Sequence, residues 1–121
     1  MKKSGKIFWQ DLTVENAETV KDFYCAVAGW EVEEVKVGDH MDYNMIDPES
    51  KEVIAGICHK KGYLSKFPAQ WLNYVMVEDI SSSAEKCKAM GGEIIDGPAM
   101  MGEHKYLIVK DPEGAYLALM Q

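Results

Sequence analysis

The sequence lacks a long apolar segment and has few cysteines, and each shortage excludes a class of protein. No apolar run approaches the ~18 residues of a membrane-spanning helix, and none follows the basic start at residues 1–6, so we expect neither membrane contact nor a signal peptide. The three cysteines, Cys25, Cys58 and Cys87, show no C-x-x-C spacing. This scatter is typical of a reducing cytosol and not of a disulfide framework. The sequence therefore predicts a cytoplasmic protein.

Positive charge is also in short supply. Lysine and arginine together number 13 against 20 aspartates and glutamates, which gives a net charge of −7. Nucleic-acid binding needs a basic face, so this balance argues against a nucleic-acid partner. No glycine-rich phosphate loop is present, because Gly91-Gly92 closes a helical pattern and does not open one. No Ser-His-Asp or Cys-His arrangement can be recognised from spacing, so no catalytic residue is assigned.

The sequence does contain a tripeptide motif that occurs twice. Asp-Pro-Glu stands at Asp47 and again at Asp111, about half the chain later, and each copy precedes an apolar run. The segments 14–16 and 77–79, each a Val-Glu-Asn or Val-Glu-Asp triplet, open two helical patterns at nearly the same offset. Matches in the same order at nearly constant spacing indicate an internal repeat. Any α+β chain with two strand–helix units would offer part of this pattern, and that alternative stays open here.

Each repeat is expected to form a strand, a helix and three further strands, a βαβββ module. The modules would cover about residues 6–60 and 69–121, joined by a linker over 61–68, and the length of 121 residues fits one domain, 1–121. Two such modules predict an α+β fold with eight strands. One helix would cover the outer face of each module, and a cleft suited to a small ligand would lie between them.

Alternation, helical spacing and turn residues place the elements. The first helix begins after Asn16 and ends at Gly29. Its apolar stripe comprises Ala17, Val20, Phe23, Tyr24, Val27 and Ala28. The second helix is capped by Asp79 or by Ser82, the latter in a capping box. Its inner face comprises Ile80, Ala84, Cys87 and Met90. The expected strands are 7–14, 31–37, 41–46, 52–60, 70–77, a short strand from Ile94 that Gly97-Pro98 breaks, 105–109, and a closing strand from Tyr116.

Several of these motifs together resemble a known family. Asp22-Phe23-Tyr24, then Ala28-Gly29-Trp30, the segment 77–92 and the late Asp111-Pro112-Glu113-Gly114 resemble the vicinal oxygen chelate superfamily, which includes glyoxalase I, bleomycin resistance proteins and extradiol dioxygenases. The resemblance covers nearly the whole chain and is closest to small single-chain proteins described only as glyoxalase-related. It implies paired βαβββ modules that form a U-shaped, half-open eight-stranded barrel, and assembly as a homodimer.

The resemblance also implies where a divalent metal would bind. In metal-dependent members, His, Gln or Glu on the opening and closing strands hold an ion that acts as a Lewis acid. The matching positions in this sequence are Trp9 (Gln10 with a bulge), Ala55 (Gly56 with a slipped register), Leu72 (or Asn73) and Ala118. Only Gln10 is an accepted ligand type, so no metal cofactor is predicted. A metal would need ligands at other positions.

Strand alternation suggests what lines the expected cleft. The candidate ligand-binding residues are Trp9, Gln10, Asp11, Ala55, Ile57, His59, Leu72, Tyr74, Met76, Tyr116, Ala118 and Met120. Such a wall is rich in aromatic residues and methionine and suits a flat, partly apolar ligand. His59 would be a ligand contact or a base, or else an exposed residue at a strand end. His40 and His104 lie in turn-like stretches and are expected to be solvated.

Three functions follow from these observations. The first is a protein that binds a small, partly aromatic molecule without the family's metal, as bleomycin resistance proteins do. The second is a metal-dependent lyase, isomerase or dioxygenase of the same superfamily with relocated ligands, for example Gln10, Asp11 and His59. The third is an interaction subunit without a ligand of its own. The sequence does not decide whether the chain is an enzyme.

Overall fold

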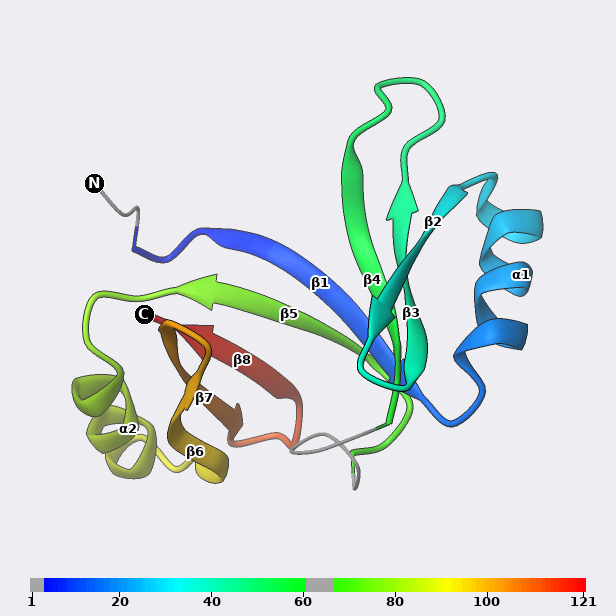
Figure 1. The fold of residues 1–121 in the computed structure, drawn as a ribbon. Coiled ribbons are helices and arrows are strands. Elements are labelled where there is room, and N and C mark those ends of the chain that lie inside the picture. The colour runs from blue at the N-terminus through cyan, green and yellow to red at the C-terminus, as the bar shows by residue number, and fades with distance from the viewer. Residues whose placement is uncertain (1–3, 61–66) are drawn as a thin grey trace. The chain divides into compact units, whose positions relative to one another are not determined.

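The computed structural model describes residues 4–60 and 67–121, and within them the chain forms two helices and eight strands (Figure 1). In chain order these are β1 (Ile7–Val14), α1 (Ala17–Ala28), β2 (Glu31–Val37), β3 (His40–Ile46), β4 (Val53–His59), β5 (Trp71–Met76), α2 (Ile80–Ala89), β6 (Glu93–Met101), β7 (His104–Lys110) and β8 (Tyr116–Met120). The strand order is β2-β3-β4-β1-β5-β8-β7-β6, which is open because it begins at β2 and ends at β6. The predicted α+β class and the repeated βαβββ element order are confirmed.

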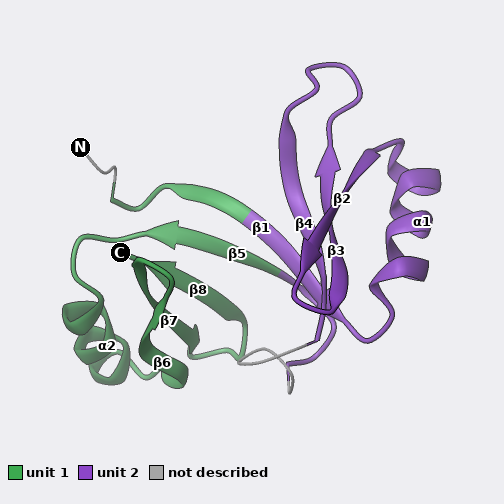
Figure 2. Cartoon of the chain, viewed as in Figure 1, with its two compact units in different colours: residues 1–9, 72–121 green, residues 10–71 purple. Residues whose placement is uncertain are grey.

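The chain divides into two compact units (Figure 2). One unit contains residues 1–9 and 72–121, and the other contains residues 10–71. The residues just before β1 are hydrogen-bonded through their backbone to the end of β5, in the first of these units. Gly5 N donates to Met76 O at 2.7 Å, and Met76 N donates to Lys6 O at 3.0 Å. Most of the expected linker, residues 61–66, lies outside the described residues.

In the unit of residues 10–71, α1 packs against one face of the strands β2-β3-β4-β1, which we call the covered face; the opposite face is the far face. β1 and β4 run parallel, with Leu12 opposite Ile57. The helix begins as predicted, because the Asn16 side chain accepts a hydrogen bond from Thr19 N at 3.1 Å. It ends at Gly29, whose φ of 75° is the left-handed conformation that glycine adopts without a steric cost.

The stripe expected on α1 is wrong for three residues. Phe23 and Val27 are 57% and 66% exposed, and Ala28 is also exposed. The helix instead meets the core through Val20 and Tyr24. The expected stripe is wider than the surface that a single sheet face can cover, so its outer members stay in solvent.

In the unit of residues 1–9 and 72–121, α2 packs against β6 and β7. The Asp79 carboxylate caps it by accepting hydrogen bonds from Ser81 N and Ser82 N at 3.0 and 3.4 Å, so the alternative cap at Ser82 is wrong. Met90 is also not part of the inner face, because it lies beyond the helix end and is 77% exposed. The buried cluster beneath α2 comprises Ile80, Ala84, Leu107, Val109 and Leu119.

β6 differs from the expected short strand. It continues past Gly97-Pro98 to Met101, because two register shifts against β7 absorb the irregularity without ending the pairing. Gly97 has a φ of 94°, and a Cβ there would lie 2.7 Å from Tyr106 O. The position therefore requires glycine, and the glycine marks a bulge and not the end of a strand.

Candidate functional site

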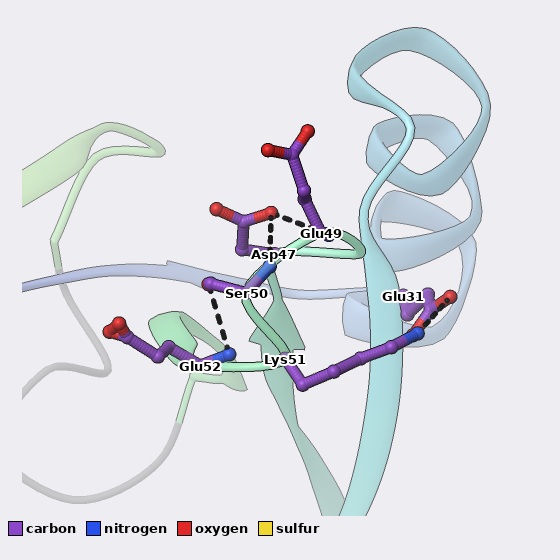
Figure 3. Close-up of polar contacts among 6 residues, drawn as sticks. All are labelled: Glu31, Asp47, Glu49, Ser50, Lys51 and Glu52. Atoms are coloured by element: carbon purple, nitrogen blue, oxygen red, sulfur yellow. Dashed lines mark hydrogen bonds and ion pairs between the residues drawn. The ribbon is translucent and has the colours of Figure 1, made fainter.

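The turn between β3 and β4 is held by its own side chains (Figure 3). Asp47 Oδ1 accepts hydrogen bonds from Glu49 N at 2.8 Å and from Ser50 N at 3.4 Å. Ser50 Oγ accepts one from Glu52 N at 3.2 Å. The backbone N–H groups of Glu49 and Ser50 lower the pKa of Asp47, because they stabilise its charged form. This network fixes the residues that lead into β4 and thereby the start of that strand.

Lys51 completes the same turn. Its φ of 64° makes it the only described residue other than glycine with a positive φ. Its ammonium group lies 3.0 Å from the carboxylate of Glu31, at the start of β2 (Figure 3). Both side chains are more than half exposed, so the ion pair adds little stability. It does, however, neutralise the carboxylate that directly follows Trp30.

A cavity of about 310 Å³ opens in the unit of residues 10–71. Five residues line it: Gln10, Trp30, Ile54, Ala55 and Trp71. They come from β1, from the segment after α1, from the start of β4 and from the start of β5. Gln10 supplies the lining's polar side chain, and the other four are apolar. We call this cavity the tryptophan pocket.

Tyr24 of α1 holds the two indoles of the tryptophan pocket in place. Its ring stacks on Trp30 with centroids 5.7 Å apart and an interplanar angle of 20°. Its hydroxyl accepts a hydrogen bond from Trp71 Nε1 at 3.1 Å. The two indoles lie 5.9 Å apart at 89° to each other. Because both rings are fixed by their neighbours, the pocket has a preformed aromatic corner.

The structure separates the candidate residues of this unit by face. Ala55 and Ile57 belong to the buried core beneath α1, so they lie on the covered face, and the expectation that they share the far face is wrong. Asp11 lies on the far face, opposite Gly56. Gly56, the slipped-register alternative, therefore occupies the place on that face that Ala55 was expected to fill. Gln10 and Ala55 nevertheless meet, in the tryptophan pocket.

A second polar group surrounds Asp42 on β3. Its Oδ1 accepts a hydrogen bond from His59 N at 2.9 Å and lies 3.5 Å from His40 Nε2 and 3.5 Å from His59 Nδ1. The three side chains are 17–24% exposed. The expectation of a solvated His40 is wrong, because the residue begins β3 and its ring packs near His59 at 5.8 Å. His104 is exposed, as expected. A carboxylate between two imidazoles can orient both rings.

Cys58 is the neighbour of this group on β4. Burial raises its pKa to about 12, and the negative charges of Asp11 and Asp42 and a hydrogen bond to Asp42 act in the same direction. The thiol is therefore protonated at neutral pH. Because only a thiolate acts as a nucleophile or a metal ligand, Cys58 is suited to neither role.

The remaining candidates lie in the other unit. Leu72, Tyr74, Met76, Tyr116, Ala118 and Met120 share the face opposite α2, as alternation predicts, because Tyr74 pairs with Ala118 and Met76 with Met120. Val75 and Leu119 face α2. Leu72, Tyr74, Ala118 and Met120 are at most 8% exposed, and Trp9 is half-buried. Whether this set binds a ligand stays a prediction.

The positions that would hold the family's metal do not fit a divalent ion. Trp9, Gly56, Leu72 and Ala118 carry no oxygen, imidazole or thiolate donor. Within residues 4–60 and 67–121, no three or more His, Cys, Asp or Glu side chains are grouped so that they could hold an ion. Gln10, the one ligand type, lines the tryptophan pocket.

Sequence reasoning missed three lining residues of that pocket: Trp30, Ile54 and Trp71. Trp30 lies between α1 and β2, outside any strand, so alternation assigned it to no face. Trp71 opens β5 at the end of the unit. The available signal was composition, because the chain has three tryptophans. Trp30 directly precedes β2, and Trp71 is the first residue of β5. A bulky ring at the start of a strand can close a cavity.

Comparisons with known proteins agree on the fold. The model of the Glyoxalase/Bleomycin resistance protein/Dioxygenase superfamily matches residues 6–119. The curated relative "Putative glyoxylase CFP32" of Mycobacterium bovis is 25% identical over 120 residues, which are 98% of this chain but 45% of that protein. The chain thus spans about half the length of the curated relatives it matches.

Solved structures show the same fold at low identity. A member of this superfamily from Vibrio splendidus 12B01 aligns with a TM-score of 0.63 at 15% identity, covering 96% of this chain and 99% of that one. The Mn(II)-bound glyoxalase from Novosphingobium aromaticivorans aligns with a TM-score of 0.62 at 12% identity, covering 99% of this chain and 40% of that one. Streptomyces coelicolor methylmalonyl-CoA epimerase in complex with 2-nitronate-propionyl-CoA aligns with a TM-score of 0.58 at 12% identity, covering 98% of this chain and 97% of that one. Neither helix in the described part of the chain is both long and apolar enough to span a bilayer.

Proposed function

The chain belongs to the glyoxalase/bleomycin resistance protein/dioxygenase superfamily, and from this premise we propose that it binds a small, partly aromatic molecule in the tryptophan pocket, without the metal that other members use. The observation that carries the proposal is the pair of indoles, Trp30 and Trp71, fixed at 89° around a cavity of about 310 Å³. Ligand pockets usually measure ~300–1,000 Å³ and have apolar walls with a few polar groups.

The donor chemistry supports the metal-free part of the proposal. The four family positions hold a tryptophan, a glycine, a leucine and an alanine, and none of these can ligate a divalent ion through its side chain. The aromatic wall offers a different source of binding energy, because a planar ligand on an indole gains apolar contact and ring–ring attraction. Homodimer assembly and a cytoplasmic location stay predictions.

The metal-dependent lyase or isomerase is the second candidate. The group formed by Asp42, His40 and His59 favours it, because a half-buried carboxylate beside two imidazoles could serve acid–base chemistry. The fold of a Mn(II)-bound glyoxalase is shared. The interaction subunit is the weaker alternative, because an open pocket would then have no role.

The proposal is tested by titrating the protein with 2-naphthol in an isothermal calorimeter. We expect saturable binding that Trp30→Ala weakens at least about tenfold, since removing an aromatic anchor from a pocket typically costs more than 1 kcal/mol. Trp30→Leu, which keeps an apolar wall, should weaken it less. Phe8→Ala removes an aromatic ring from the other unit and is the control with unchanged affinity.

Circular dichroism and thermal melting establish that each variant is folded. Folded Trp30→Ala and Trp71→Ala proteins that bind 2-naphthol as tightly as the parent would place the ligand elsewhere. Absence of any heat of binding at millimolar 2-naphthol would also contradict the proposal.

A further inference from the structure

We infer that the tryptophan pocket takes an uncharged planar molecule of one or two rings, held at its edge by a hydrogen bond to Gln10. This inference rests on the proposed function and adds to it the class of ligand. Three properties of the pocket lead to it: the charge of its surroundings, the arrangement of its rings, and its single polar side chain.

The charge of the pocket excludes an anion. None of the five lining residues is charged. The sequence contains no arginine, the side chain that pairs best with carboxylates and phosphates, and the net charge is −7. A carboxylate or phosphate entering the pocket would lose its hydration without gaining a counter-charge, and the overall field would repel it. The pocket therefore differs in kind from a site for an acyl-CoA or another acidic conjugate.

A cation is also poorly matched. Two carboxylates adjoin lining residues in the chain: Asp11, which follows Gln10, and Glu31, which follows Trp30. Asp11 lies on the far face, opposite Gly56. Lys51 neutralises Glu31, with its ammonium group 3.0 Å from the carboxylate. A ring face could attract a cation, but one face of Trp30 is covered by Tyr24, which stacks on it at 20°. The remaining attraction does not replace the hydration that a buried ammonium group loses.

Size and ring geometry favour a planar ligand. A volume of about 310 Å³ is at the small end of the range for ligand pockets, which suits one or two fused rings. The indoles of Trp30 and Trp71 are perpendicular. A flat molecule stacked on one indole therefore meets the other at its edge, and both are preferred aromatic arrangements.

Gln10 supplies the polar contact. Its amide can donate and accept hydrogen bonds. The lining also contains two indole N–H groups, which can only donate, and that of Trp71 already donates to the Tyr24 hydroxyl at 3.1 Å. Gln10 lies on an exposed position of β1, so water satisfies its amide when no ligand is present. A hydroxyl or carbonyl on the ligand's edge can replace that water without leaving a buried polar group unpaired.

Four naphthalenes of nearly equal shape test the inference: 2-naphthol, naphthalene, 2-naphthoate and 2-naphthylmethylammonium. Each is titrated calorimetrically at pH 7 into the parent protein and into Gln10→Ala and Trp30→Ala. We expect 2-naphthol to bind most tightly and 2-naphthoate to bind at least about tenfold more weakly. Gln10→Ala should weaken 2-naphthol about two- to tenfold, the effect of one lost hydrogen bond, and leave naphthalene unchanged.

The possible results distinguish a failure of this inference from a failure of the proposed function. Binding of 2-naphthoate or of the ammonium compound as tight as that of 2-naphthol would overturn the uncharged class, even while Trp30→Ala abolishes binding. Equal losses for 2-naphthol and naphthalene in Gln10→Ala would overturn the role of Gln10. If no compound binds, or if Trp30→Ala changes nothing, the proposed function fails and this inference fails with it.

Discussion

At the scale of single residues, apolar side chains occupy the positions where the family resemblance implies metal ligands. Ala118 is fully buried on the face opposite α2, and Leu72 is 3% exposed on the same face. A carboxylate in place of Ala118 would be buried without a counter-charge unless a metal accompanied it. Small and apolar side chains at these positions therefore make the core stable without an ion.

Cys58 gives a prediction of pH dependence. Its pKa is raised to about 12 in the folded protein, whereas an unfolded thiol ionises near pH 9. Between these values only the unfolded chain gains by losing the proton, so this residue lowers the free energy of unfolding as the pH rises above about 9. Below pH 9 it has no such effect.

The variant Cys58→Ala isolates this contribution. Urea denaturation at pH 8 and pH 10.5 should show a smaller loss of stability for Cys58→Ala than for the parent protein. Other groups titrate in the same range, so the comparison uses the difference between the two proteins. Parallel losses in both would show that the thiol is not held protonated by the fold.

At the scale of elements, the repeated Asp-Pro turns have the same physical role. Asp111 Oδ1 accepts hydrogen bonds from Glu113 N at 2.8 Å and from Ala115 N at 3.0 Å, as Asp47 does in the first copy. The pKa of Asp111 is lowered by these backbone N–H groups, so its charged form is favoured in the folded state. Each turn starts a strand, but only the strand after Asp47 contributes to the tryptophan pocket, through Ile54 and Ala55.

These two turns make a matched pair of variants. Asp47→Ala and Asp111→Ala should each lower the melting temperature by about 2–5 °C, as the loss of a local capping bond does. Only Asp47→Ala should also weaken 2-naphthol binding, because it loosens the start of β4. Calorimetry and thermal melting on both variants check this. An equal loss of affinity in Asp111→Ala would mean that general destabilisation, not the position of β4, controls the pocket.

The helices and strands also show which structural features can be predicted from neighbouring residues in the sequence. Capping by Asn16 and the termination at Gly29 follow from chemistry within one turn of helix, and both were predictable. Exposure of Phe23 and Val27 was not, because it depends on how much of α1 the sheet covers. The continuation of β6 past Gly97 likewise depends on pairing with β7, and the residues around Gly97 alone do not predict that pairing.

At the scale of the whole molecule, most of the fold was predicted from the internal repeat. Two turns and two strand–helix junctions at constant offset were enough to predict eight strands and two helices in the right order. The pocket was harder to predict, because Gln10 and Ala55 are brought together with Trp30 and Trp71 only by packing between separate elements. Alternation assigns a face to each strand residue, but it does not show where a face is left uncovered.

The central claim is that this superfamily fold binds its ligand without the family's metal. The most direct measurement is the metal content, by mass spectrometry, of protein purified without a chelator and without a His-tag, before and after incubation with Mn²⁺, Ni²⁺ or Zn²⁺ and desalting. The positions held by Trp9, Gly56, Leu72 and Ala118 predict less than about a tenth of an equivalent of metal in every sample. Near-stoichiometric metal that survives desalting would contradict the account and favour the metal-dependent enzyme.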